Sequence, residues 1–163
     1  MPILSRNQLL ALPDDELLRA CRIDRRRGTG PGGQKRNKTE SAVTVTHEAT
    51  DIDGSSDETR SQISNRLIAL RHLRLNLALR LRETPPTAWA FADVPSLRSE
   101  FYPQWTAALL DVLMGCGLRI SEAAAFCGLS TGRLVRDLAR DPALWQEVNR
   151  LRRAAGLTPL RGE

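Results

Sequence analysis

A short run of small residues, Gly30-Pro31-Gly32-Gly33-Gln34, carries the groups of this chain that we expect to do chemistry. Glycine and proline form a tight loop that is poor in side chains, so the carboxamide of Gln34 is its one side chain with hydrogen-bonding groups. Cationic residues flank the loop on both sides: Arg25, Arg26, Arg27, Lys35, Arg36 and Lys38. A loop of small neutral residues flanked by basic residues is suited to pass between phosphate groups and reach a confined site.

Positive charge is concentrated around this loop. The 163-residue chain has a formal net charge of +5, but residues 22–82 alone hold 13 Lys or Arg and 7 Asp or Glu, a net charge of +6. A basic segment on a nearly neutral remainder favours a polyanionic partner, most simply nucleic acid. A solvated basic face that binds nothing has the same composition, so charge alone leaves both interpretations open.

Other classes of site find little support in the sequence. The three cysteines, Cys21, Cys116 and Cys127, are widely spaced and odd in number, which indicates reduced thiols rather than a disulfide framework. No pair has zinc-ligand spacing, and no Ser-His-Asp set or carboxylate pair is evident, so we expect no metal and no cofactor. With no signal-peptide pattern and no membrane-spanning apolar run, we expect a cytoplasmic protein without a membrane partner.

The elements that would position the loop follow from hydrophobic periodicity. In order, the patterns predict a helix over residues 5–20, strands over 21–25, 41–47 and 50–56, and a long helix over 58–83. Ser5 or Asn7 suits the first cap, and a second start is open at Asp14 after Pro13. In the 41–47 strand, Val43 and Val45 share one face.

The long helix is identified by an apolar stripe along one of its faces. The stripe is formed by residues three or four apart: Ile63, Leu67, Leu70, Leu73, Leu77 and Leu81. We expect Ser56 or Asp57 to cap this helix, which ends before Pro85-Pro86.

The C-terminal part is predicted to be helical. After a proline-rich stretch, the patterns predict helices over 105–114, 120–127, 131–140 and 142–155, with Ser130 and Asp141 as N-caps. We therefore expect an α+β protein. We expect a first domain over residues 1–83 that carries the loop, a linker over 84–103 and a helical domain over 104–163. The first domain holds a small mixed sheet with the Gly-Gly-Gln (GGQ) loop packed on the long helix; the last is an all-α, helix-turn-helix-like bundle.

Residues 21–81 resemble the catalytic domain of class I peptide chain release factors and of the short ribosome-rescue hydrolases related to them. The matches occur in the family's order and spacing: Ile23-Asp24, the small-residue run from Gly28 to Gln34, Asn37 and Lys38, Ser41-Ala42-Val43, Thr46-His47, Arg60-Ser61-Gln62, Asn65 and Leu73-Arg74. The chain departs from the family pattern at Lys35-Arg36, where an aromatic or imidazole residue and a small aliphatic one are usual. It also departs at Asp51 and Asp53, so we expect the third strand to be short or irregular.

The resemblance implies a function. In this family the loop enters the peptidyl transferase centre of the ribosome and promotes attack of water on the ester of peptidyl-tRNA. It implies catalytic roles for Gly32, Gly33 and Gln34, and a dedicated methyltransferase that modifies the glutamine amide. The partners are then the large-subunit rRNA and peptidyl-tRNA, with the flanking cations on RNA phosphates. His47, at the end of a strand, is expected to be structural.

The C-terminal helices bear on which member of the family this is. The chain has no recognisable stop-codon-reading motif and no Lys/Arg-rich tail, and residues 104–163 resemble a helix-turn-helix instead. Within it, the helix predicted over residues 131–140 is the candidate recognition helix. Arg133, Arg136 and Arg140 share one face of this helix, while Leu134 and Leu138 point inward. This face either contacts nucleic acid, with ribosomal RNA favoured over DNA, or is an ordinary solvated surface.

Three functions therefore compete. The leading one is codon-independent hydrolysis of peptidyl-tRNA on stalled ribosomes or free large subunits. The second is a non-hydrolytic ribosome- or RNA-binding protein that retains the fold but has lost turnover. The unusual pair Lys35-Arg36 is the feature that favours it. A DNA-binding regulator is the third, and it leaves Gln34 without a role.

Overall fold

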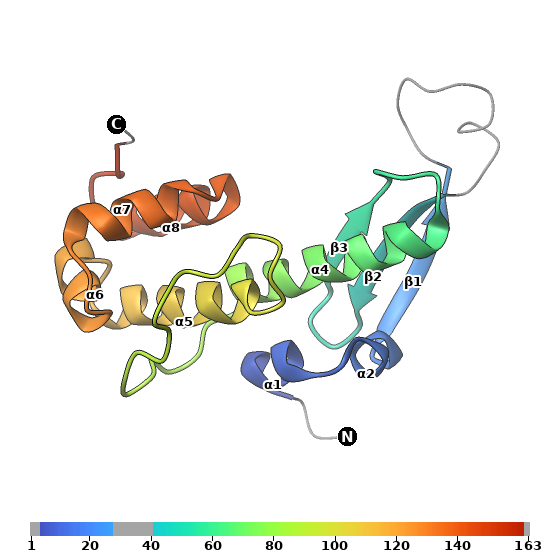
Figure 1. The fold of residues 1–163 in the computed structure, drawn as a ribbon, viewed down its shortest axis with the longest axis horizontal. Coiled ribbons are helices and arrows are strands. Elements are labelled where there is room, and N and C mark those ends of the chain that lie inside the picture. The colour runs from blue at the N-terminus through green and yellow to red at the C-terminus, as the bar shows by residue number, and fades with distance from the viewer. Residues whose placement is uncertain (1–3, 28–40, 162–163) are drawn as a thin grey trace. The chain divides into compact units, whose positions relative to one another are not determined.

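A computed structural model describes residues 4–27 and 41–161, and the chain divides into two units, Met1–Ala78 and Leu79–Glu163. The element order is α1-α2-β1-β2-β3-α4 followed by α5-α6-α7-α8 (Figure 1). One small sheet and seven helices make up these described residues, so the expected α+β class is confirmed. None of the helices described is both long and apolar enough to span a bilayer.

Two short helices begin the N-terminal unit, where the sequence suggested one helix with an optional second start. Helix α1 (Arg6–Ala11) opens with a capping box, in which Ser5 and Gln8 exchange hydrogen bonds. Helix α2 (Asp14–Arg19) follows Pro13, which occupies its N-cap. The second start is therefore the correct interpretation, because a proline has no N–H to continue α1 and restricts the residue before it.

The sheet is antiparallel, so the expectation of a mixed sheet is wrong. Its strands β1 (Cys21–Arg26), β2 (Ala42–His47) and β3 (Ile52–Ser56) lie in sequence order. The third strand was expected to be short or irregular, and β3 is short but regular: it has five residues, one fewer than β1 or β2, and all five pair in register with β2. Asp51 explains this: it adopts the left-handed conformation that the turn requires (φ 54°), which aspartate tolerates better than most residues.

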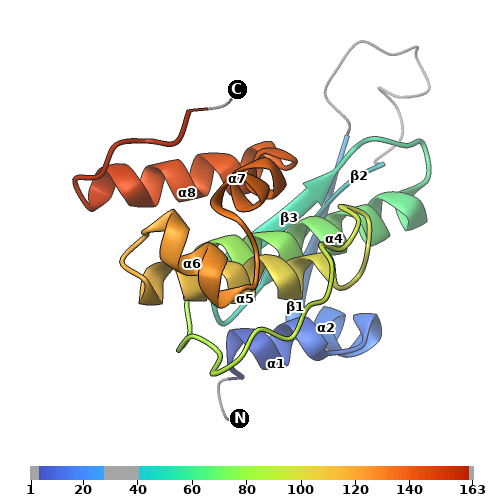
Figure 2. The same cartoon turned by 60° about the vertical axis from the view of Figure 1, so that its left-hand side comes forward.

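Helix α4 (Gln62–Arg80) runs along one face of the sheet (Figures 1 and 2). Contact is close at Gly54 of β3, where a Cβ atom would lie 2.1 Å from the backbone nitrogen of Leu73. The expected caps at Ser56 and Asp57 are wrong, because the helix begins later. Ser61 accepts a hydrogen bond from the Ser64 N–H at 3.2 Å, and its carbonyl accepts from the N–H of Asn65 at 2.9 Å.

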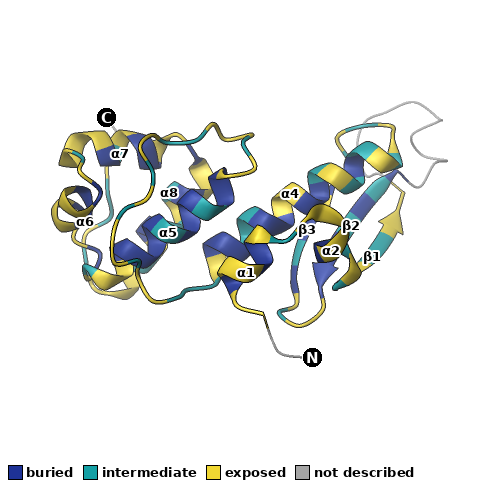
Figure 3. Cartoon of the chain, turned by 60° about the horizontal axis from the view of Figure 1, so that its bottom comes forward, coloured by how far each residue is buried: buried dark blue, intermediate teal, exposed yellow. Residues whose placement is uncertain are grey.

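The predicted apolar stripe of α4 is only partly buried (Figure 3). Leu70, Leu73 and Leu77 are buried, as expected, but Ile63 and Leu67 are 69% and 43% exposed. In the first turns of the helix, the side chain that points into the fold is the polar Asn65, which is completely buried. The hydropathy pattern therefore identifies the wrong face for the start of the helix.

The C-terminal unit follows the predicted order of helices closely. Its elements are α5 (Tyr102–Gly115), α6 (Ile120–Phe126), α7 (Thr131–Ala139) and α8 (Pro142–Ala154). Both predicted caps are confirmed, since Ser130 accepts from the Arg133 N–H at 3.2 Å and Asp141 from the Ala143 N–H at 2.9 Å. Residues 81–101 contain no helix or strand. The limits predicted for the three domains stay a prediction.

Candidate functional site

The structure describes the two points at which the predicted catalytic loop joins the fold. Arg27 follows β1 and Ser41 precedes β2, and the intervening residues 28–40 lie outside the described part. Six predicted site residues fall within that range: Gly32, Gly33, Gln34, Lys35, Arg36 and Lys38. Their roles stay predictions, and the described geometry concerns the scaffold that carries them.

The entry to this segment is a cationic strand end. Arg25, Arg26 and Arg27 are all exposed, and Arg26 is paired in register with Ala42, the first residue of β2. Because side chains alternate along a strand, consecutive arginines extend to different sides of it. The structure thus brings the first three of the predicted RNA-binding residues together at the base of the loop.

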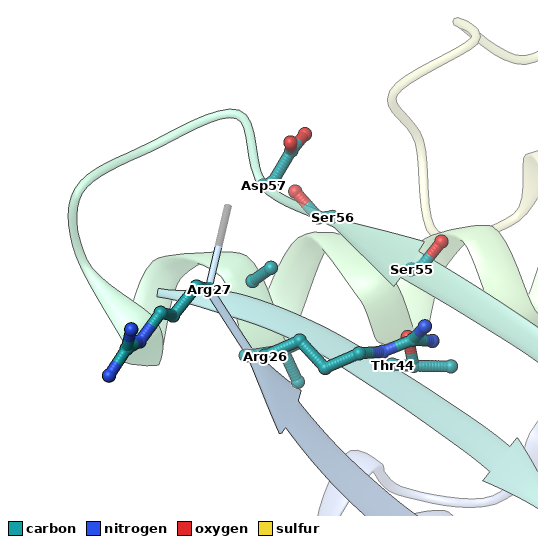
Figure 4. A pocket seen from close by; sticks show the side chains of 8 residues that line it. Arg26, Arg27, Thr44, Ser55, Ser56 and Asp57 are labelled. Carbon is teal, nitrogen blue, oxygen red and sulfur yellow. The ribbon is translucent and has the colours of Figure 1, made fainter. Parts of the chain in front are cut away.

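A cleft of about 290 Å³ opens beside this strand end. The arginines Arg26 and Arg27, the start of β2 and the end of β3 line it. Figure 4 shows the Arg26 side chain extending toward Thr44, whose hydroxyl accepts from the guanidinium at 3.4 Å, while Arg27 extends the other way. Ser55, Ser56 and Asp57 add hydroxyls and a carboxylate. The cleft is therefore polar, with cations at its edge.

The exit of the segment is held by a buried side chain. Ser41 is 5% exposed, and its carbonyl accepts a hydrogen bond from Nδ2 of Asn65 at 2.7 Å. The same amide donates to the carbonyl of Thr59 at 2.8 Å. On its other side, Oδ1 accepts from the Thr59 N–H at 2.9 Å and from the Thr59 hydroxyl at 3.0 Å. A longer contact, 3.4 Å, comes from the hydroxyl of Ser56.

Two potentially reactive groups, His47 and Cys21, lie away from this end of the sheet, whereas Nδ1 of His72 is hydrogen-bonded to the carbonyl of Ser55 at 2.7 Å, beside the cleft. His47 and Cys21 pair with each other across β1 and β2, at the opposite end of β2 from Ala42. Burial lowers the pKa of His47, with a smaller opposing effect from Glu48. Burial raises the pKa of Cys21 to about 11, and Glu48 adds to that rise. A neutral imidazole bonded to Thr50 at 2.9 Å and a protonated thiol fit structural roles.

The other predicted cations lie in the C-terminal unit. Arg133, Arg136 and Arg140 are exposed on or just after α7, while Leu134 and Leu138 are fully buried, as predicted. Arg133 is partly engaged, because its guanidinium lies 2.9 Å from the buried carboxylate of Asp137. The turn before α7 contains Gly128 with φ +69°, a conformation that favours glycine.

Several residues that the structure places at the site have no role in the sequence-based prediction. Asn65 belongs to the family matches but carries no assigned role there, and Thr44, Ser55 and Asp57 are not among the predicted site residues. Their positions follow from strand register and from where α4 begins. Its place among the family matches is a sequence signal that points to Asn65, whereas the burial of Ala69, four positions later on the same helix face, is known only from the structure.

Comparison with known proteins agrees with the resemblance. The sequence model of the family described as RF-1 domain matches residues 14–89. Peptide chain release factor 2 of Acidothermus cellulolyticus is 34% identical over 105 residues, which are 64% of this chain and 26% of that protein. Peptide chain release factor 1 of Parafrankia sp. is 42% identical over 78 residues, 48% of this chain and 22% of that protein.

The chain thus covers only about a quarter of the length of these relatives. The match includes both strands that carry the ends of the Gly-Gly-Gln segment, the segment itself and the whole of α4. Over residues 14–89 the sequence therefore matches the RF-1 domain, the catalytic domain of class I release factors.

Proposed function

We propose that this protein hydrolyses the ester of peptidyl-tRNA on the ribosome without reading a codon. The observation that carries the proposal is the RF-1 domain match over residues 14–89, which contains Gly32-Gly33-Gln34. The exposed arginines at the loop entry support it, because they provide phosphate contacts where the loop leaves the sheet. The protein would act in the cytoplasm, on large-subunit rRNA and peptidyl-tRNA.

The chemistry requires little from the protein. Water attacks the ester carbonyl carbon, the bond to the tRNA 3′ oxygen breaks, that oxygen takes up a proton, and the peptide leaves as an acid. Gln34 has no acid or base function at neutral pH, so we assign its amide to holding the water and excluding larger nucleophiles. Its backbone N–H would donate to the developing oxyanion, a contribution of roughly 2.7–4 kcal/mol for one such donor.

Positioning supplies the rest of the rate enhancement. Holding water in line with the ester contributes up to roughly 7–11 kcal/mol in ideal cases. Glycine at positions 32 and 33 permits a close approach to RNA that a side chain would obstruct. A glutamine methyltransferase that modifies the amide of Gln34 is a further proposed partner, carried over from the family resemblance.

Codon independence is the finer part of the proposal. The sequence shows no recognisable stop-codon-reading motif, and the unit after residue 78 is helical and lies mostly outside the matched segment. We assign ribosome docking to that unit, with the exposed Arg136 and Arg140 of the α7 face on ribosomal RNA. Arg133 contributes less, because Asp137 already neutralises it.

The alternative is a ribosome-binding protein without turnover, which the unusual Lys35-Arg36 pair favours. One experiment separates the two functions. Ribosomes carrying labelled peptidyl-tRNA, with the mRNA channel either empty or filled, are mixed with wild-type protein or the Gly33→Ala variant. Release by wild type alone supports hydrolysis. Equal binding of both proteins with no release from either supports the alternative.

A further inference from the structure

A fully buried carboxamide is unusual on a helix whose neighbouring buried residues are apolar. Asn65 is 0% exposed, whereas Ala69, Leu70 and Leu73 continue the buried face of α4. Burying an amide without hydrogen bonds is costly, so such a residue requires a complete set of partners. Asn65 has one: both hydrogens of Nδ2 and the acceptor Oδ1 are occupied.

The partners of Asn65 come from separate segments. One donor reaches Ser41, which immediately follows residues 28–40, and the other reaches Thr59, in the connection between β3 and α4. Oδ1 of Asn65 accepts hydrogen bonds from the backbone N–H and the hydroxyl of Thr59. Its longest contact is with the hydroxyl of Ser56, at the end of β3. One side chain therefore links the loop exit, the end of the sheet and the helix.

The two ends of the loop are held differently. On the entry side, Arg26 pairs with Ala42 in the strand ladder. Ser41 lies one residue beyond that last pair, and among the hydrogen bonds of the described residues the contact of its carbonyl is with Asn65. The residue just before β2 is thus held by a side chain in addition to the Arg26–Ala42 pair that ends the ladder.

We propose that Asn65 is a positioning residue for the hydrolysis assigned above. By holding the carbonyl of Ser41, it sets the orientation from which the segment carrying Gln34 leaves the fold. This inference rests on the proposed function, since it names a residue that serves the same loop. A misplacement of about 1 Å at a reacting group costs on the order of a hundredfold in rate, so loosening the exit lowers catalysis.

A matched control lies on the same helix. Asn76 donates through Nδ2 to the carbonyl of Asp53 at 2.7 Å, which is also a bond from α4 to a backbone group of the sheet. Asp53 pairs with Thr46 near the far end of β2, away from the loop. Asn65→Asp and Asn76→Asp therefore both remove a donor to a backbone carbonyl and add a charge, but only the first affects the loop exit. Asn65 is fully buried and donates two such bonds, whereas Asn76 is half-buried and donates one, so the stability of both variants is measured alongside the rate.

The test measures single-turnover peptide release by the full chain over a range of protein concentrations. We expect Asn65→Asp to lower the maximal rate by roughly tenfold to a hundredfold, with little change in the concentration that gives half-maximal rate. Asn76→Asp should stay within about twofold of wild type. Should both variants lower thermal stability while the maximal rates remain equal, Asn65 is merely structural and the proposal is overturned. If Asn65→Asp does not fold, Asn65→Ala and Asn76→Ala provide the same comparison without a buried charge.

Hydrogen exchange gives a readout that does not depend on activity. Amides at the start of β2, Ala42 and Val43, should exchange faster in Asn65→Asp than in Asn76→Asp. Equal exchange in both variants would show that Asn65 does not hold the loop exit. If wild type releases no peptide, the proposed function has failed, and the exchange result alone then decides whether Asn65 anchors this segment.

Discussion

The approach of β3 to α4 at Gly54 leads to a prediction whose size follows from the structure. A Cβ atom at this position would lie 2.1 Å from the Leu73 nitrogen and 2.3 Å from the Ala69 carbonyl oxygen. Both are backbone atoms of α4, so no side-chain rotation relieves the overlap. Ordinary carbon contacts are about 3.5–4.0 Å, and Gly54→Ala therefore forces the strand and the helix apart by more than about 1 Å.

We expect Gly54→Ala to lower the free energy of unfolding by at least about 3 kcal/mol, the upper part of the range for overpacked cores. For a unit of this size, 1 kcal/mol corresponds to about 4–8 °C in Tm, so the N-terminal unit should lose roughly 12–24 °C. Calorimetry of the full chain measures the shift. Protection of the β2 amides from hydrogen exchange assigns the loss to that unit.

Gly128→Ala is the matched control. This glycine has φ +69°, and a Cβ atom there would have no neighbour within 4 Å, so the effect of its substitution is conformational rather than steric. Its expected cost is about 1–2 kcal/mol, confined to the C-terminal unit. A Gly54→Ala protein within about 1 kcal/mol of wild type would refute the reasoning, because it would mean that β3 and α4 separate easily.

Three further predictions concern separate parts of the chain. Arg74 donates to three carbonyls at the end of α1 and to the largely exposed Asp14. Arg74→Met should therefore lower the free energy of unfolding, measured in urea, by about 3 kcal/mol. Asp14→Asn should lower it by less than about 1 kcal/mol. Burial lowers the pKa of His47, so the unfolded chain binds the proton more readily. The stability due to neutral His47 is then present above about pH 6.5 and lost as the pH falls. The decrease in the free energy of unfolding between about pH 7 and pH 5.5 should therefore be smaller in His47→Gln than in wild type. Replacing Arg136 and Arg140 by alanine should weaken ribosome binding and reduce the slope of log K against log salt by about 1 per lost phosphate contact; an unchanged slope would remove α7 from the docking surface.

Local signals made the C-terminal helices predictable. Ser130 and Asp141 accept hydrogen bonds from residues two or three positions further along the chain, so their role depends on little else. The break at Pro13 was visible for the same reason. These features require no knowledge of which elements pack together.

The start of α4 was not predictable in this way. Ile63 and Leu67 continue an apolar stripe in the sequence, but the fold buries Asn65, because its partners Ser41 and Thr59 come from other segments. A polar side chain whose partners are supplied by tertiary structure is invisible to hydropathy. The cleft residues Thr44 and Ser55 likewise meet only because β2 pairs with β3 in this register.

The Gly-Gly-Gln run and its cations are contiguous in sequence, so they could be singled out from the sequence, and the family resemblance gave them their proposed chemistry. The residues that hold the ends of this segment could not be identified in the same way. Arg25 and Arg26 lie at the exposed end of β1, which extends one residue beyond the predicted strand end. Their contact with RNA and the catalytic roles of Gly33 and Gln34 stay predictions.

The most direct measurement of the central claim is the rate at which labelled peptide is released from ribosomes stalled without a stop codon, using saturating wild-type or Gln34→Ala protein. We expect complete release by wild type and release near the spontaneous rate with Gln34→Ala. Wild-type protein that occupies these ribosomes but leaves the ester intact, or a Gln34→Ala protein as fast as wild type, would contradict it.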